Sequence, residues 1–444
     1  MSAPDRRTIS DIAPLLRARA LSPVDLVQQC LTRIEQGRDG NAFITVMSER
    51  ALEDAERASR ELAAGRYLGP LHGIPVAIKD LVEIEGTATT SGSRLPAPVA
   101  STDAPVVRRL REAGAIIVGK TNLHEFAFGT TSDETAFGPV RHPKDPSRSA
   151  GGSSGGSAAA LVEGMCFGSV GTDTGGSIRI PAAACGVVGL KPTLGEIPTD
   201  GVVPLSTTLD HVGPLARTVG DAGLLFHAMK GATVQGVAAA GGRLAFGVPR
   251  RYFFDRLEPA VRSCVERAIT RIREAGCTVH DVDVDHAEWT PHVYLHIVLP
   301  EASHYHAQGL SEHADHYSPG IRLRLEMGRY LLAEDYVRAM RLRDALTRSV
   351  VRALERRDGL ILPTLPIPAP AIGAATVDVD GTEAPVRATT LSLTQLFNLT
   401  GHPAISLPAG TGPEGLPRGI QIVGHRGRTE RLLDIAAAVE GIIR

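Results

Sequence analysis

A helix pattern followed directly by a short apolar run occurs three times in the chain, and this alternation constrains the fold more than any other feature. The three copies are "APVVRRLREAGAIIVGK" (104–120), "PAVRSCVERAITRIREAGCTVHDVDV" (259–284) and "LRDALTRSVVRALERRDGLILP" (342–363). Each begins with apolar residues at helical spacing and ends in a run suited to a buried strand. Strands separated by amphipathic helices are typical of α/β proteins. The sequence therefore predicts a mixed, largely parallel central sheet covered by helices on both faces.

The remaining segments extend this pattern over one large domain, residues 1–444. Residues 9–64 have helical patterns, and Ser22 before Pro23 is typical of a helix start. "GIPVAIKD" (73–80) is predicted as a buried strand, and the C-terminal part supplies two more strands and a closing helix. No linker or internal repeat divides the chain, so we predict a single domain.

Charge and cysteine content narrow the classes of function. The formal net charge is -2, which disfavours nucleic acid or an anionic membrane as the main partner. The N-terminus has no leader pattern and no apolar run reaches membrane-spanning length, so a soluble, cytoplasmic protein is expected. The 5 cysteines have no CxxC spacing. Buried, reduced thiols are therefore expected in preference to a disulfide framework or a zinc site.

The segment "AGGSSGGSAAALVEGMCFGSVGTDTGGSIRIPAAACG" (150–186) has the glycine and serine content of a linker but contains apolar runs. "SAAALVEGM" is suited to a tightly packed helix and "MCFGSVGTD" to a central strand. The glycine-rich turns between them carry serines at the ends of these elements. Glycine lets the backbone approach a ligand and lets successive N–H groups point at one anion. These turns are therefore predicted to carry chemistry.

Two common motifs do not explain these turns. A phosphate-binding loop of the Walker type requires a lysine after its glycines, and the segment contains none. Gly151 to Gly155 matches G-x-S-x-G, the nucleophile elbow of α/β-hydrolases, with Ser153 as the nucleophile. That elbow follows a strand, whereas "RHPKDPSRSA" (141–150) is polar and broken by proline. The match to the elbow is interpreted as accidental.

Several ordered motifs resemble the amidase signature family of serine hydrolases. They are "LHGIPVAIKD", "GGSSGGSAAA", "GTDTGGSIRIPAAACGVVGLKPT", "LDHVGPLARTVGDAG" and "FNLTGHPAISLPAG". The resemblance is close over 65–230, the signature core, and looser over 355–444, the C-terminal part of that core. Residues 1–64 would be an N-terminal helical region. Residues 250–350 match no family pattern, as expected of a variable helical region that tailors substrate choice. The resemblance implies the amidase signature fold.

The resemblance implies that Lys79, Ser153 and Ser177 form a Ser-cisSer-Lys triad, with a cis peptide bond before Ser153. A serine hydroxyl is a poor nucleophile until a base removes its proton. Lys79 follows the apolar run "IPVAI", where burial disfavours the ammonium form and lowers the pKa. Neutral Lys79 would then accept a proton from Ser177 through the Ser153 hydroxyl. The implied oxyanion hole consists of the backbone N–H groups of Thr174, Gly175, Gly176 and Ser177.

Further residues are assigned to the surroundings of the triad. The resemblance places Ala127 and Phe128, from "NLHEFAFGTTSDETAFG", beside the substrate together with Ser153. Ser154, Asp173 and Arg179 are expected to support the triad, the last two as an ion pair or as hydrogen-bond anchors.

Histidines are concentrated in one part of the chain. Eight of the 15 lie between His280 and His316, including His292 and His296 at helical spacing. No HExxH or carboxylate pattern accompanies them, so we predict a solvated or pocket-lining helical region without a metal.

The predicted function is an amidohydrolase that cleaves the C–N bond of a small-molecule amide through an acyl-enzyme, without a cofactor. Esters and carbamates, as in urethanase or aryl acylamidase activity, present a similar carbonyl. One alternative is the glutamine-hydrolysing subunit of a tRNA-dependent amidotransferase, which would require partner proteins. Others are an α/β-hydrolase-type esterase using Ser153 and a catalytically silent binding protein. The sequence leaves the substrate and the oligomeric state open.

Overall fold

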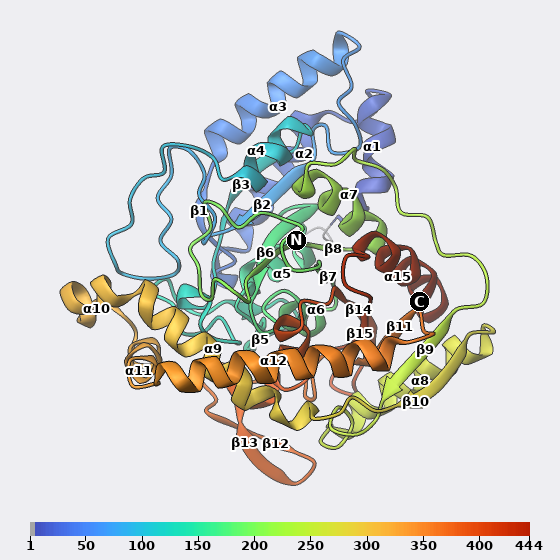
Figure 1. Ribbon diagram of the computed structural model, residues 1–444. Coiled ribbons are helices and arrows are strands. Elements are labelled where there is room, and N and C mark those ends of the chain that lie inside the picture. Colours follow the sequence, from blue (N-terminus) through green and yellow to red (C-terminus); the bar gives the residue numbers. More distant parts are fainter. Residues whose placement is uncertain (1–4) are drawn as a thin grey trace.

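The computed structural model describes residues 5–444, which fold around an 11-stranded sheet with two small hairpin sheets beside it (Figure 1). The order in the large sheet is β1-β3-β2-β6-β8-β7-β14-β15-β11-β9-β10. The strands are β1 (Phe43–Val46), β2 (Pro75–Lys79), β3 (Ile116–Thr121), β4 (Arg141–His142), β5 (Asp145–Ser149), β6 (Gly168–Asp173), β7 (Val188–Lys191), β8 (His211–Ala216), β9 (Ala245–Pro249), β10 (Thr278–Val282), β11 (Gly359–Pro363), β12 (Thr376–Val379), β13 (Thr382–Pro385), β14 (Ala404–Thr411) and β15 (Pro417–Val423).

The helices follow the strands along the chain and cover the large sheet. They are α1 (Ile9–Arg17), α2 (Pro23–Gln36), α3 (Ser48–Ala63), α4 (Pro105–Glu112), α5 (Gly155–Val162), α6 (Arg179–Cys185), α7 (Val219–Lys230), α8 (Pro259–Glu274), α9 (Thr290–Tyr305), α10 (Ala307–His313), α11 (Pro319–Gly328), α12 (Ala333–Leu354), α13 (Val386–Leu391), α14 (Gln395–Leu399) and α15 (Thr429–Ile443). Short 3₁₀ turns are η1 (Arg38–Gly40), η2 (Glu125–Ala127), η3 (Ala287–Trp289) and η4 (Ala314–His316).

Different helices cover the two faces of the sheet, as strand β2 illustrates. Its side chains alternate between faces because successive residues of a strand point in opposite directions. Val76 and Ile78 belong to a core shared with α4, α7, α8 and α15. Ala77 belongs to a second core shared with α3, α5 and α6. The prediction of an α/β fold with helices on both faces is confirmed.

The sheet is mixed, and its parallel part is confined to two flanks. Strands β3, β2 and β6 pair in parallel, as do β11, β9 and β10. The strands between these flanks, from β8 to β15, pair antiparallel with their neighbours. Mixed topology is therefore confirmed, but a largely parallel sheet describes only the flanks. Strands β14 and β15 are joined by residues 412–416, and so short a connection joins only antiparallel strands.

Local signals in the sequence account for several element boundaries. The Ser22 hydroxyl accepts a hydrogen bond of 3.2 Å from the Val24 N–H, and Pro23 occupies the first turn of α2 as predicted. The helical interpretation of 9–64 missed β1, a strand of only four residues at the edge of the sheet. Strand β5 also precedes the glycine-rich turn where a polar loop was expected. It pairs with β4 and forms an isolated bridge from Arg148 to Ala371.

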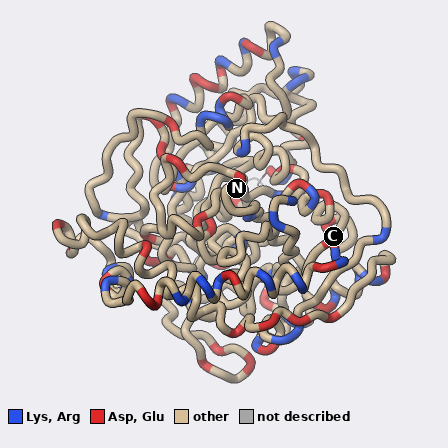
Figure 2. The backbone as a smooth tube through the Cα atoms, in the orientation of Figure 1, with Lys and Arg blue, Asp and Glu red and all other residues tan. Residues whose placement is uncertain are grey.

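The region 250–350 contains both sheet and helical layers. Strand β10 extends the sheet and α8 packs against it. Helices α9 and α11 pack together, and α12 packs on α9, in the lower half of Figure 1. Acidic and basic residues are interspersed along the outer helices α3 and α12 (Figure 2). No helix within residues 5–444 is long and apolar enough to cross a membrane.

Candidate active site

Lys79 is the last residue of β2, and its side chain is fully buried between the sheet and the glycine-rich turns. Its Nζ donates hydrogen bonds to Ser153 Oγ at 2.7 Å and to Thr172 Oγ1 at 2.8 Å. Thr172 lies near the end of β6, the parallel neighbour of β2. The carboxyl ends of these two strands therefore meet at the lysine. No carboxylate within the described chain forms an ion pair with Lys79.

Burial changes the protonation of this lysine. Removal from water lowers the pKa of Lys79 to about 7, although the negative charges of Asp173 and Asp210 oppose this shift. A large fraction of Lys79 is therefore neutral near pH 7. A neutral amine with a hydroxyl 2.7 Å away has the geometry of a general base.

Ser153 lies in the turn that leads into α5. The Gly152–Ser153 peptide bond is cis, as the resemblance implies. The Ser153 carbonyl accepts a hydrogen bond of 3.1 Å from the Ser132 hydroxyl. Ser154, the residue before α5, donates its N–H to the Ser177 carbonyl at 3.2 Å and its hydroxyl to the Thr172 carbonyl at 3.2 Å. Ser154 thus joins the two serine-bearing turns to β6.

Ser177 lies in the loop between β6 and α6 and is 4% exposed. Its carbonyl is held by Ser154, whereas its hydroxyl makes no hydrogen bond within residues 5–444. In particular, Ser153 and Ser177 are not joined by a hydrogen bond in the described part of the chain. The arrangement leaves the Ser177 hydroxyl free to turn toward a substrate.

The two glycines before Ser177 lie in tight surroundings. A Cβ atom on Gly175 would come within 2.6 Å of Tyr294 Oη and 3.1 Å of a Leu391 methyl group. Gly176 has a φ of +143°, and its Cβ would overlap the Thr394 hydroxyl. Thr394 Oγ1 donates a hydrogen bond of 2.6 Å to the Gly175 carbonyl. Only glycine fits at these positions, and the loop is held in one conformation.

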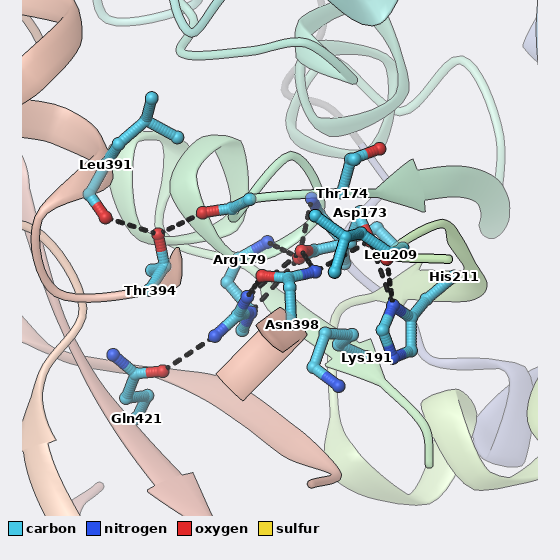
Figure 3. A network of polar contacts seen from close by, with 12 residues as sticks. Asp173, Thr174, Arg179, Lys191, Leu209, His211, Leu391, Thr394, Asn398 and Gln421 are labelled. Carbon is cyan, nitrogen blue, oxygen red and sulfur yellow. Dashed lines mark hydrogen bonds and ion pairs between the residues drawn. The ribbon is translucent and has the colours of Figure 1, made fainter. Parts of the chain in front are cut away.

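Asp173, the last residue of β6, is the centre of a buried polar network (Figure 3). Its carboxylate accepts hydrogen bonds from Arg179 Nε and Nη2, both at 3.0 Å, and from Asn398 Nδ2 at 2.8 Å. Burial alone would raise the pKa of Asp173, but the Arg179 guanidinium holds it well below its usual range. Asp173 Oδ2 also accepts the Ile178 N–H at 3.1 Å. The predicted ion pair is present and fixes both ends of the loop.

Four residues of the site were not identified from the sequence: Thr172, Asp210, Thr394 and Asn398. Asp210 accepts a hydrogen bond of 2.5 Å from Thr174 Oγ1, and desolvation raises the pKa of Asp210 to about 6. Asp210 and Asn398 fall inside two of the family-like motifs, "LDHVGPLARTVGDAG" and "FNLTGHPAISLPAG". The available signal was a polar residue among apolar neighbours in each motif: Asp210 directly precedes β8, and Asn398 lies in α14.

Ala127 is the last residue of the turn η2, and Phe128 follows it, beside the serine-bearing loop. Both are buried, Phe128 at 1% and Ala127 at 3% exposure. Residues 129–131, which come next, line a cavity of about 440 Å³. A Cβ on Gly152 would lie 2.7 Å from the Thr131 N, so this segment packs directly against the turn that carries Ser153. A role in substrate contact for Ala127 and Phe128 stays a prediction.

The histidine-rich segment divides between two environments. His292 and His296, on α9, line a groove with Trp289. His306 is buried against Phe126 and Tyr317, with its Nδ1 3.1 Å from the Tyr317 hydroxyl. Within residues 5–444, no group of three His, Cys, Asp or Glu side chains is arranged to hold a metal ion.

Known proteins resemble the chain over nearly its whole length. Residues 25–433 match the family model described as Amidase. A Pseudomonas putida protein named "Amidase" is 41% identical over 434 residues, covering 94% of this chain and 92% of that protein. A glutamyl-tRNA(Gln) amidotransferase subunit from Geobacter sp. (strain M21) is 35% identical, covering 98% of this chain and 96% of that protein. A solved amidase crystal structure superposes with a TM-score of 0.94 at 38% identity, covering 99% of this chain and 100% of that one.

Proposed function

Because the chain belongs to the amidase family, whose members are hydrolases of C–N bonds, we propose that it is a serine amidohydrolase using Lys79, Ser153 and Ser177. Ser177 is the nucleophile, Ser153 relays the proton and Lys79 is the general base. The observation that carries this proposal is the 2.7 Å hydrogen bond between Lys79 Nζ and Ser153 Oγ in a fully buried environment. It supplies the base that a serine nucleophile requires.

The first half of the proposed reaction forms an acyl-enzyme. Ser177 Oγ attacks the amide carbonyl while its proton passes to Ser153 Oγ, whose own proton passes to neutral Lys79. The carbonyl oxygen becomes an oxyanion that accepts hydrogen bonds from backbone N–H groups of residues 174–177. Collapse of this intermediate breaks the C–N bond. Lys79 returns the proton through Ser153 to the leaving amine, which departs and leaves Ser177 as an ester.

The second half hydrolyses the ester. Lys79 is neutral again and accepts a proton from water through the same relay as the water oxygen attacks the acyl carbon. The C–O bond to Ser177 then breaks, its oxygen recovers the proton, and a carboxylic acid is released. Each proton moves between the triad and the substrate or water, so the steps include no cofactor.

Small-molecule amides are the proposed substrates, and esters and carbamates share the reacting carbonyl. A second candidate function is glutamine hydrolysis, because a relative named as a glutamyl-tRNA(Gln) amidotransferase subunit is 35% identical over nearly the whole chain. A panel of aliphatic amides, anilides, carbamates and glutamine distinguishes these activities. Ammonia release from glutamine alone would favour the second candidate.

The assignment of the nucleophile is tested with Ser177→Ala and a serine-directed phosphonate probe. We expect Ser177→Ala to abolish turnover without a change in fold, and the probe to label Ser177 in the wild type. Peptide mapping by mass spectrometry locates the label. Labelling of Ser153 would instead support the esterase alternative and contradict the proposed relay.

A further inference from the structure

A cavity of about 440 Å³ beside the proposed catalytic turn contains two arginines and two carboxylates. Arg387, on α13, and Arg324, on α11, both line it, as do residues 372–375. Their guanidinium carbons are 5.6 Å and 5.5 Å from the centre of the Phe128 ring. Both cations therefore lie next to Phe128, which the family resemblance assigns to the surroundings of the substrate.

Arg387 has no anionic partner within residues 5–444. Its side chain forms no ion pair and no hydrogen bond within these residues, and its Nε is buried without an acceptor. Arg324 Nε is likewise buried without an acceptor. Burial lowers the pKa of Arg387 to about 10, and the neighbouring charge of Arg324 acts in the same direction. A guanidinium without a partner beside a cavity, next to a second arginine with a free Nε, is suited to bind an anion.

The carboxylates of the cavity do not neutralise Arg387. Glu134 accepts hydrogen bonds from Arg324 Nη2 at 3.0 Å and from the Gly320 N–H at 2.8 Å. Asp133 accepts the Gly373 N–H at 3.0 Å and the Thr131 hydroxyl. His124 Nε2 also lies 3.3 Å from Glu134 Oε2. Both acids are thus held by other groups, and neither forms an ion pair with Arg387 within residues 5–444.

Helix α13 connects Arg387 to the catalytic loop. Leu391 is one turn after Arg387, so the two side chains lie on the same face of the helix. Leu391 contacts the position that a Cβ of Gly175 would occupy, and Tyr294 Oη contacts it from α9. Tyr294 also interacts electrostatically with Arg387, so Arg387 and the loop that carries Ser177 have two neighbours in common, Leu391 and Tyr294.

We propose that Arg387 binds a carboxylate of the substrate, and that the preferred substrates are small amides carrying a carboxylate on the acyl or the amine portion. The planar guanidinium matches a carboxylate with two parallel hydrogen bonds. The cavity volume is within the range of small-molecule sites. This inference rests on the proposed amidase function and specifies its substrate class.

The test compares amides that differ in charge. Succinamate carries a carboxylate on the acyl side, N-acetylglycine carries one on the amine side, and butyramide is the neutral counterpart of succinamate. We expect wild-type kcat/KM to be highest for one of the two acids. Arg387→Gln should lower that value about 10- to 100-fold, as for loss of a charge-assisted hydrogen bond. Hydrolysis of butyramide should stay within about twofold, and Arg387→Lys should recover part of the loss.

Two controls distinguish a failure of the proposed carboxylate site from a failure of the proposed amidase function. Arg329→Gln removes an exposed positive charge at the end of α11 and should leave every substrate unchanged. Binding of succinamate and N-acetylglycine to Ser177→Ala, measured by calorimetry, reports on Arg387 without turnover. If Ser177→Ala abolishes hydrolysis but Arg387→Gln affects acids and butyramide equally, the carboxylate site is wrong and the amidase function stands. If Ser177→Ala retains activity, the proposed function itself fails.

Discussion

At the scale of single residues, the environment of Lys79 determines the pH at which the proposed reaction runs. The lysine is fully buried, and its two hydrogen bonds go to hydroxyl groups, which carry no charge. Desolvation therefore lowers the pKa of Lys79 by more than the negative charges of Asp173 and Asp210 raise it, and the neutral lysine is populated near pH 7. The pH dependence of the activity should therefore change when either Lys79 or a neighbouring charge is replaced.

The first prediction concerns the base itself. Below its pKa of about 7 Lys79 is protonated and cannot accept the serine proton, so kcat/KM should rise with pH through about 7. Lys79→Ala should lower kcat/KM by about 10²–10⁴, the usual contribution of a general base. Lys79→Arg should be nearly as inactive because guanidinium stays protonated. Near wild-type turnover by the arginine variant would show that position 79 supplies only positive charge.

The second prediction concerns Asp210. Its negative charge raises the pKa of Lys79, in opposition to burial. Asp210→Asn removes that charge while keeping an oxygen that accepts the Thr174 hydroxyl. The pKa of Lys79 should therefore fall, and the acid limb of the kcat/KM profile should move to lower pH. A limb at unchanged pH would show that Asp210 does not act on the lysine.

At the scale of elements, the sequence predicted local structure well and long-range contacts poorly. The helix-then-strand segments correspond to α4 with β3, α8 with β10 and α12 with β11. Their periodicity is local, so it can be read directly from the chain. By contrast, Asn398 contacts Asp173 across more than 200 positions, and no periodicity encodes such a pair. The antiparallel centre of the sheet was missed for the same reason.

The third prediction concerns the loop between β6 and α6. Gly176→Ala places a side chain at a φ of +143°, where its Cβ would overlap the Thr394 hydroxyl. We expect a loss of about 1–3 kcal/mol in unfolding free energy from the strain, together with reduced kcat because the backbone N–H groups shift. Denaturant unfolding and kinetics measure the two effects. Gly236→Ala, which meets no atom within 4 Å, is the matched control and should change neither.

At the scale of the whole molecule, segments distant in sequence are interleaved in one sheet. Strands β14 and β15 from the C-terminal part lie between β7 of the signature core and β11. Arg179 on α6 bonds to Asn398 on α14 at 2.7 Å and to Gln421 on β15 at 3.1 Å. The loop bearing Ser177 therefore depends on contacts with residues more than 200 positions away, and the site exists only when both parts have folded.

The last prediction tests whether residues 250–350 fold as part of this single unit. The chain has 1 tryptophan, Trp289, which packs against the main hydrophobic core at the start of α9. Its fluorescence reports on the variable helical region, whereas far-ultraviolet circular dichroism reports on all helices and strands. Because α12 packs on both α9 and β11, the two signals should follow one denaturation curve with a common midpoint. A fluorescence midpoint at lower denaturant concentration than the circular dichroism midpoint would show that residues 250–350 unfold separately. The chain would then contain two cooperative units.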